Sequence, residues 1–224
     1  MPRLPRSTQI QRSVIFHTIN RGILRQEIFH NNDDARLFLN TLKKYQTKFL
    51  FSLYHWCLMP NHYHLVLELQ NGQHLSKIIG ACQQIYAQYY HRKYKTAGKL
   101  FQNRFKSQAI EKEKYLLACG RYVERNPLRA GLVKLPWEWQ WSSAKFYALN
   151  EDDSVTTQNP LWPGPRNNQA DYQKWLTDTF NAEEETKIFR NAASMIGSHE
   201  FRRRHMMYNR TNRDTSYLSI YALH

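Results

Sequence analysis

The chain has 224 residues and a formal net charge of +14, with 32 lysines and arginines against 18 aspartates and glutamates. That length suits one domain, or one domain with an appendage, and 42% apolar and 14% aromatic residues exclude a disordered chain. No window approaches the roughly 18 to 20 uninterrupted apolar residues of a membrane span, so we expect no transmembrane helix. The excess of positive charge predicts a polyanion as partner, with nucleic acid ahead of an anionic membrane surface.

The first residues and the cysteines indicate the compartment. Residues 1–12 are basic and polar and lack the apolar run of a signal peptide. The three cysteines, Cys57, Cys82 and Cys119, are odd in number and widely spaced, unlike a disulfide framework or a zinc knuckle. We therefore expect a reducing cytoplasm, association with the nucleoid, and no membrane partner.

Hydrophobic periodicity predicts seven elements in the first part of the chain. In order, we expect a strand at 13–20, a helix from residue 32, strands at 49–58 and 62–69 joined as a hairpin, a helix from residue 76, a strand at 104–110 and a helix at 111–125. The first six match the split βαβ order of ferredoxin-like folds. We therefore predict an α+β fold: a ferredoxin-like, RRM-like antiparallel sheet with helices on one face.

The second predicted helix carries a stripe of apolar residues that indicates its buried face. Ser76 is suited to cap its beginning. The residues expected to be buried are Ile78, Cys82, Ile85 and Tyr89.

The composition changes after about residue 149. Residues 150–168 are mostly polar and have no periodicity, which is typical of a linker or a surface loop. Segments 171–180 and 184–193 have helical patterns, and the last twenty residues are polar. We therefore expect a catalytic domain at 1–149 and a mostly helical C-terminal extension of loops and short helices at 150–224.

Positive charge is concentrated between residues 70 and 110, a stretch without Asp or Glu in which cations alternate with tyrosines and phenylalanines. Cations neutralise phosphates, and aromatic rings stack on unpaired bases. The cluster therefore predicts a nucleic-acid-binding surface, with a solvated basic face over buried aromatics as the alternative. Its six candidate contacts are Arg92, Lys93, Lys95, Lys99, Arg104 and Lys106.

Two histidines separated by one residue occur in the predicted strand at 62–69. Side chains alternate along a strand, so His62 and His64 point to one side of the sheet and Tyr63 to the other. Two imidazoles in this arrangement hold a single metal ion when a third ligand comes from elsewhere. The alternative is two ordinary histidines beside a turn.

The predicted helix at 111–125 offers a nucleophile. Tyr122 and Asn126 are four residues apart and thus on one helical face. From this face a tyrosine phenol can attack a phosphorus atom, and an amide oxygen can complete the ligands of the metal ion. The alternative is that Tyr122 packs in the core and Asn126 caps the helix before Pro127. Tyr115 is a rival nucleophile seven residues earlier, but Cys119 stands where the amide would be needed.

Two segments resemble known motifs. Residues 59–66, Met-Pro-Asn-His-Tyr-His-Leu-Val, resemble the HUH motif (histidine, hydrophobic, histidine) of single-strand tyrosine transposases. Residues 121–133, with the pattern Tyr-x-x-x-Asn-Pro, resemble the nucleophile helix of the REP-associated tyrosine transposases. Residues 17–22 and 139–143 are also similar to that group. The resemblance covers roughly residues 10–148, and its two main motifs occur in order about sixty residues apart.

The resemblance implies a role for each candidate residue. Tyr122 takes the place of the nucleophile, His62 and His64 those of metal ligands, and Asn126 that of a third, amide-type ligand. Tyr63 departs from the plain aliphatic residue at the centre of the motif, but its ring can still be buried. The resemblance implies Mg²⁺ or Mn²⁺ as cofactor, whereas imidazole ligands alone favour zinc or another transition metal.

By the same resemblance, the protein is an enzyme that cleaves and rejoins single-stranded DNA at REP-type hairpins through a 5′-phosphotyrosine. Two other function classes stay open. A ferredoxin-like sheet with aromatics is also an RNA-recognition architecture, which would make the chain a non-catalytic single-stranded nucleic-acid-binding protein. A metal-dependent nuclease with water as nucleophile would make Tyr122 expendable. The sequence does not decide between a monomer and a homodimer.

Overall fold

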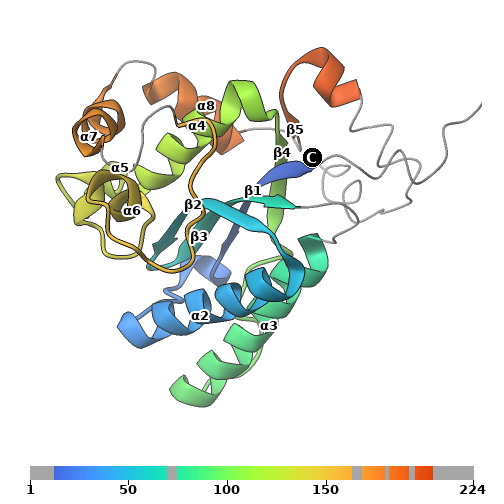
Figure 1. The fold of residues 1–224 in the computed structure, drawn as a ribbon. Helices are drawn as coiled ribbons and strands as arrows, with labels where there is room; N and C mark the ends of the chain where they lie inside the picture. The colour runs from blue at the N-terminus through green and yellow to red at the C-terminus, as the bar shows by residue number, and fades with distance from the viewer. Residues whose placement is uncertain (1–12, 70–74, 163–167, 180–181, 192–194, 204–224) are drawn as a thin grey trace, which may run out of the picture.

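Five strands form one sheet in the described part of the chain, in the order β2-β3-β1-β4-β5 (Figure 1). The strands are β1 (Val14–Arg21), β2 (Ser52–Met59), β3 (His62–Leu69), β4 (Lys106–Ile110) and β5 (Met195–Ile196). The helices are α2 (Asn32–Phe49), α3 (Leu75–Tyr94), α4 (Lys112–Glu124), α5 (Asn126–Arg129), α6 (Ala144–Ala148), α7 (Gln169–Thr177) and α8 (Ala182–Asn191), with 3-10 turns η1 (Ile23–Arg25) and η2 (Pro136–Glu138). The structure is a computed structural model that describes residues 13–69, 75–162, 168–179, 182–191 and 195–203.

The first four strands confirm the predicted ferredoxin-like order. β1 lies between β3 and β4 and runs antiparallel to both, and β2 forms the expected hairpin with β3. The turn of that hairpin is Pro60-Asn61, between the end of β2 and the start of β3. The strand that carries His62 and His64 is therefore an interior strand of the sheet, held on both edges.

Helices α2 and α3 pack together on one face of the sheet (Figure 1). The side chain of Asn31 caps α2 by accepting hydrogen bonds from the backbone nitrogens of Asp33 and Asp34. The core between these helices and the sheet contains, among others, Phe38, Leu42, Tyr63, Leu65, Leu67 and Ile78. Tyr63 is fully buried there, so the ring at the centre of the HUH-like motif is accommodated as expected.

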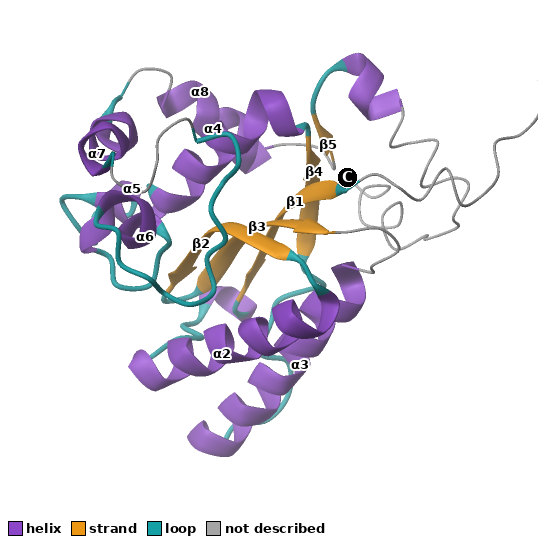
Figure 2. Ribbon diagram, in the orientation of Figure 1, coloured by secondary structure: helices purple, strands orange, loops and turns teal. Residues whose placement is uncertain are grey.

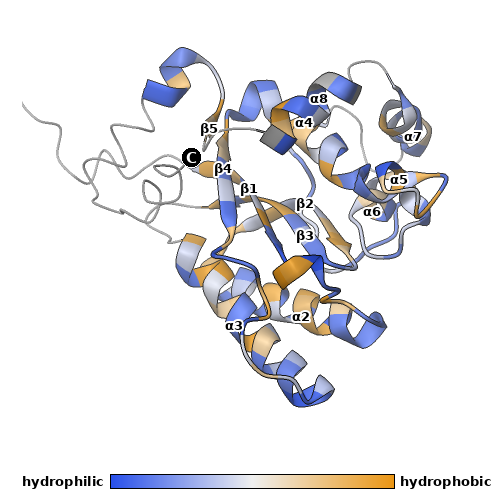
Figure 3. Ribbon diagram, turned by 180° about the vertical axis from the view of Figure 1, so that it is seen from behind, coloured by the Kyte–Doolittle hydropathy of each residue, from blue (hydrophilic) through white to orange (hydrophobic). Residues whose placement is uncertain are grey.

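The opposite face of the sheet is covered as well, which the sequence did not predict. Helix α4 packs on it, and Cys119, Tyr122 and Val123 form a second core cluster with Val66 of β3. Seen from behind, α4 and α8 lie on one side of the sheet and α2 and α3 on the other (Figure 3). The predicted picture of helices on a single face therefore holds for α2 and α3 only.

Helix α3 differs from its prediction at its beginning and in its buried face. It begins at Leu75, so Ser76 lies inside the helix and is exposed. The buried side chains include Tyr86 and Tyr90, whereas Ile85 is 38% exposed. A step of three or of four residues from Cys82 keeps nearly the same helical face. Because residues 85 and 86 are both apolar, only the packing decides between them.

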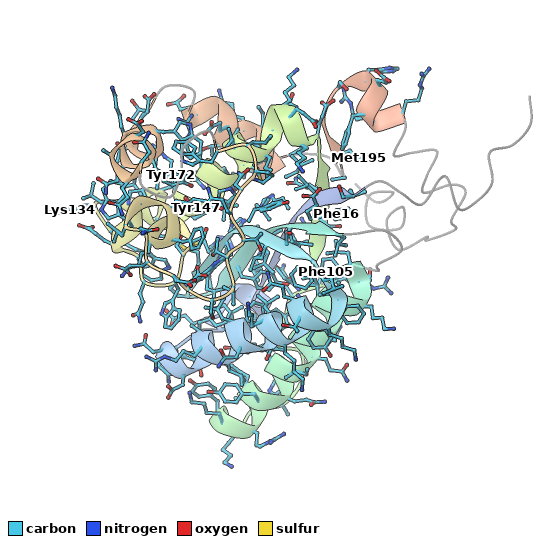
Figure 4. All side chains as sticks on the ribbon, in the orientation of Figure 1. Phe16, Phe105, Lys134, Tyr147, Tyr172 and Met195 are labelled. Carbon is cyan, nitrogen blue, oxygen red and sulfur yellow. The ribbon has the colours of Figure 1, made fainter. Side chains whose placement is uncertain are left out.

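The segment after residue 150 extends the same sheet. β5 pairs in parallel with β4, so the sheet is mixed rather than purely antiparallel (Figure 2). Helix α7 packs on α6, and the rings of Tyr147 and Tyr172 stack with centroids 4.8 Å apart (Figure 4). The predicted helices at 171–180 and 184–193 correspond to α7 and α8. The division of the chain at residue 149 stays a prediction.

No helix in the described ranges is long and apolar enough to cross a membrane. All three cysteines are free and buried.

Candidate active site

The register of three strands brings polar side chains together on the face that α4 covers. His17 of β1 lies opposite Gln108 of β4, and Ile19 of β1 lies opposite His64 of β3. Paired residues in an antiparallel sheet point to the same face. His17, Gln108, His64 and, two residues from it, His62 therefore share one face, as predicted for the two histidines of β3.

His62 and His64 lie with ring centroids 5.1 Å apart and planes nearly perpendicular. Burial, followed by the positive charges of Arg21 and Arg129, lowers the pKa of His62 to about 4. Burial also lowers the pKa of His64 well below its usual 6.5. Both imidazoles are therefore neutral near pH 7, and each has a nitrogen lone pair available to a cation.

Tyr122 projects from α4 toward these histidines. Its ring centroid lies 5.8 Å from that of His64 and 5.9 Å from that of His17, both edge to face. Tyr115 is not among the residues that line the cavity at this site, and its ring lies 5.5 Å from the Lys114 ammonium instead. Of the two candidate nucleophiles, the fold therefore places Tyr122 beside the histidine pair.

The pKa of the Tyr122 phenol is raised above 10, chiefly by burial. The positive charge of Arg129 opposes this shift. The Arg129 guanidinium lies 4.2 Å from the centre of the Tyr122 ring, and its Nη2 donates a 2.9 Å hydrogen bond to the Tyr122 carbonyl oxygen. The Arg129 cation thus contacts the face of the Tyr122 ring. The phenol oxygen of this ring would have to lose its proton in a nucleophilic attack.

Asn126 lies at the start of α5, one turn after Tyr122. Its amide nitrogen donates to the backbone carbonyl oxygens of Tyr122 and Val123, both at 3.1 Å. These hydrogen bonds agree with the alternative interpretation of the sequence, in which Asn126 caps the helix before Pro127. Because they use the nitrogen, the amide oxygen is the end left to act as a ligand, and Asn126 lines the same cavity as His62 and His64. Capping and ligation are therefore compatible, and ligation stays a prediction.

The site opens into a cavity of about 980 Å³. None of its described lining residues is acidic, and its cations are Arg21, Arg25, Arg104, Lys106, Arg129 and Arg190. A cavity lined by one sign of charge attracts a polyanion and holds it against the reactive groups. This places Arg104 and Lys106, of the predicted basic cluster, at the candidate active site.

The other four predicted cations lie away from the cavity. Arg92 and Lys93 are in the last turn of α3, and Lys95 and Lys99 follow it in an exposed loop. Lys93 forms an ion pair with the buried carboxylate of Asp34, with 2.7 Å between Nζ and Oδ1. The single basic cluster predicted from the sequence is thus two separate groups, and Lys93 is engaged within the fold.

A buried polar network fixes the helix that carries Tyr122. The carboxylate of Glu124 lies 2.8 Å from Nδ1 of His55 and accepts 2.6 Å hydrogen bonds from Ser143 and Tyr172. Gly120 allows the close approach of α4, because a Cβ there would lie 2.5 Å from Nε2 of His55. Glu124 and its partners are fully or almost fully buried, so the orientation of Tyr122 is set by a satisfied network.

Sequence reasoning missed three residues at this site. His17 and Arg129 lie inside segments with family resemblance, but nothing in the local pattern assigns them a function. Phe189 comes from α8 in the C-terminal segment, and its ring packs on that of Tyr122 with centroids 5.3 Å apart. Contacts of this kind depend on pairing and packing between distant segments, so the linear sequence carries no signal for them.

The donor atoms at this site suit a divalent cation. Two neutral imidazoles offer nitrogen and Asn126 offers an amide oxygen, and binding of a cation by these three residues stays a prediction. The described residues contain no group of three or more His, Cys, Asp or Glu side chains suited to a metal ion. Imidazole and carbonyl ligands together are acceptable to Mn²⁺ and other divalent ions.

Comparison with known proteins identifies the family. The family model described as "Transposase IS200 like" matches residues 10–126. The chain belongs to the IS200-like transposase family. The matched segment ends at Asn126 and so includes both histidines of β3 and Tyr122. The family and the fold support a transposase role. No curated protein matches the chain.

Two solved structures are similar to this IS200-like chain. One is titled "Structure of the REP associates tyrosine transposase bound to a REP hairpin", with a TM-score of 0.51 and 19% identity, covering 74% of this chain and 93% of that one. The other is a candidate transposase from Deinococcus radiodurans R1, with a TM-score of 0.39 and 14% identity, covering 59% of this chain and 92% of that one. The first shows that the fold is similar to that of a REP-associated tyrosine transposase.

Proposed function

We propose that this protein cleaves and rejoins single-stranded DNA beside hairpins, with Tyr122 as the nucleophile and His62, His64 and Asn126 as ligands of a divalent cation, Mg²⁺ or Mn²⁺. The observation that carries the proposal is the position of the Tyr122 ring, 5.8 Å from that of a neutral His64 in a cavity whose described charged lining is entirely positive.

The chemistry follows from the charge of a phosphodiester. A bound divalent cation would offset the charge on a non-bridging oxygen and polarise the phosphorus. The Tyr122 oxygen attacks phosphorus and loses its proton, and Arg129 stabilises the negative charge that develops on the phenol. The bond to the 3′ oxygen breaks, and that oxygen takes up a proton to become a free hydroxyl.

The product of this step is a 5′-phosphotyrosine. It is a phosphodiester like the bond that was broken, so no external energy source is needed for the reverse reaction. Attack by a 3′-hydroxyl on the phosphotyrosine releases Tyr122 and joins DNA. The same residues therefore serve cleavage and rejoining.

Hairpin DNA is the proposed substrate for two reasons. The similar REP-associated transposase is described as bound to a REP hairpin. In this chain, Arg104 and Lys106 line the cavity that contains Tyr122, so a single strand neutralised by these cations passes the nucleophile.

The two alternative functions, a non-catalytic nucleic-acid-binding protein and a hydrolytic nuclease, require different features of the site. A non-catalytic RNA-recognition sheet binds bases on its open face, but here α4 covers that face and histidines occupy it. A hydrolytic nuclease would use the same cation site with water, and Tyr122 would be dispensable.

A denaturing gel of labelled hairpin DNA tests the proposal. Wild-type protein with Mn²⁺ or Mg²⁺ should give a covalent adduct that excess chelator prevents. Tyr122→Phe should give neither adduct nor cleavage, and Tyr115→Phe should behave as wild type. Cleavage by Tyr122→Phe without an adduct would instead establish the hydrolytic nuclease.

A further inference from the structure

Three side chains from three strands form a buried hydrogen-bonded chain behind the histidine pair. Nδ1 of His17 lies 2.9 Å from Oε1 of Gln108, and Nε2 of His17 lies 2.9 Å from Nδ1 of His64. The rings of His17 and His64 stack at a 10° angle. His17 and His64 are each 2% exposed and Gln108 is 8% exposed, so these contacts are largely shielded from bulk water.

The direction of the hydrogen bonds follows from the chemistry of each group. An amide oxygen only accepts, so His17 must carry its proton on Nδ1. A neutral imidazole has one N–H, which leaves Nε2 of His17 as an acceptor, and the matching donor is Nδ1 of His64. His17 is 2% exposed, and burial favours the neutral imidazole that this arrangement requires.

The consequence is that His64 presents an unprotonated Nε2. His62 also has an unprotonated Nε2, because its Nδ1 lies 2.6 Å from the acceptor Oδ1 of the neighbouring Asn61 and therefore carries the proton. Both imidazoles of the pair therefore have the same nitrogen free of a proton. Two lone pairs on equivalent nitrogens are what a shared cation needs, and the one on His64 depends on His17 and Gln108, which lie outside the motif segment.

We propose that Gln108 and His17 are positioning residues, which hold His64 in the tautomer whose Nε2 binds the cation. This inference rests on the cation site of the proposed function. His17 is not itself a third ligand, because both of its nitrogens are used within the chain of hydrogen bonds. Without the Gln108 oxygen, His17 is free to donate from Nε2 to His64, and His64 then carries its proton on the nitrogen that must bind.

The test uses two substitutions and a control in the full chain. Gln108→Leu removes the acceptor at similar volume, and His17→Phe keeps a ring in the core without its nitrogens. Ser107→Ala is the control, because Ser107 is a buried neighbour of Gln108 on β4 that pairs with Thr18 and points to the other face. Two readouts are needed: the tautomer of His64 in cation-free protein, by nitrogen-15 NMR near pH 7, and the Mn²⁺ affinity, by calorimetry.

Wild type and Ser107→Ala should both show His64 protonated on Nδ1. Gln108→Leu and His17→Phe should show protonation on Nε2, together with a loss of roughly 10- to 100-fold in Mn²⁺ affinity. If one variant does not fold, the other decides. An unchanged His64 tautomer in a folded variant would overturn the inference, as would an Nε2 proton in the wild type.

The two proposals fail in different ways. A wild type with the expected tautomer but no Mn²⁺ binding would contradict the cation site and, with it, the ligand role of Nε2. Normal Mn²⁺ binding in both variants would overturn only the positioning role of Gln108 and His17.

Discussion

Replacing Arg129 by methionine tests whether this cation activates Tyr122. The substitution removes the guanidinium that lies 4.2 Å from the ring centre and the hydrogen bond to the Tyr122 carbonyl. With the phenolate charge taken at the ring centre as an upper bound, two unit charges about 4 Å apart interact by roughly 4 kcal/mol at an effective dielectric constant of about 20. Because Arg129 is exposed to solvent at the cavity, we take a screened value of about 1.5–3 kcal/mol. That corresponds to a cleavage rate lower by roughly 10- to 100-fold.

The assay is single-turnover cleavage of hairpin DNA at saturating protein and cation, measured across pH. Arg129 lowers the pKa of Tyr122, so its removal should also move the rate profile to higher pH. Arg129→Lys should retain part of the rate, since it keeps the charge but loses the planar contact. Arg36→Met, a change at an exposed residue of α2, is the matched control and should leave the rate unchanged. A wild-type rate and pH profile in Arg129→Met would refute the reasoning.

Three further substitutions address the cation, the DNA path and the stability of the fold. Asn126→Ala should raise the Mn²⁺ concentration needed for half-maximal cleavage, and an unchanged titration would leave Asn126 with capping alone. Arg104→Glu should weaken single-strand binding and lower the slope of log affinity against log salt by roughly 0.7, whereas a wild-type slope would place Arg104 off the DNA path. Asp34→Asn should reduce the free energy of unfolding at pH 7 by roughly 1–3 kcal/mol, because it breaks the ion pair with Lys93. Burial tends to raise the pKa of Asp34, but hydrogen bonds led by those from Lys93 and Tyr94 hold it below 3.8. This carboxylate therefore stabilises the fold above that pH and loses its contribution below it, and a denaturation series from pH 6 to 3 in which both proteins change in parallel would contradict the assignment.

Local periodicity was enough to place the residues of the two motifs. The alternation of β3 put His62 and His64 on one face and Tyr63 on the other, because a period of two is a property of any extended strand. The spacing of Tyr122 and Asn126 likewise followed from helix geometry.

Other features depended on which segments pack together. His17 and Gln108 are separated by 91 residues, and their contact follows from the pairing of β1 with β4. The separation of the basic cluster into two groups has a related origin, since Lys93 contacts Asp34 of α2, a residue 59 positions earlier. Sequence shows that a lysine is present, but only the fold shows which carboxylate it meets.

The central claim is that Tyr122, rather than Tyr115 or water, attacks the phosphodiester. Mass spectrometry of a trapped adduct, trimmed with nuclease and digested with trypsin, tests it most directly. We expect a phosphonucleotide on the short peptide from Tyr122 to Arg125. An adduct on the preceding peptide, which contains Tyr115, or cleaved DNA with no adduct on either peptide, would contradict it.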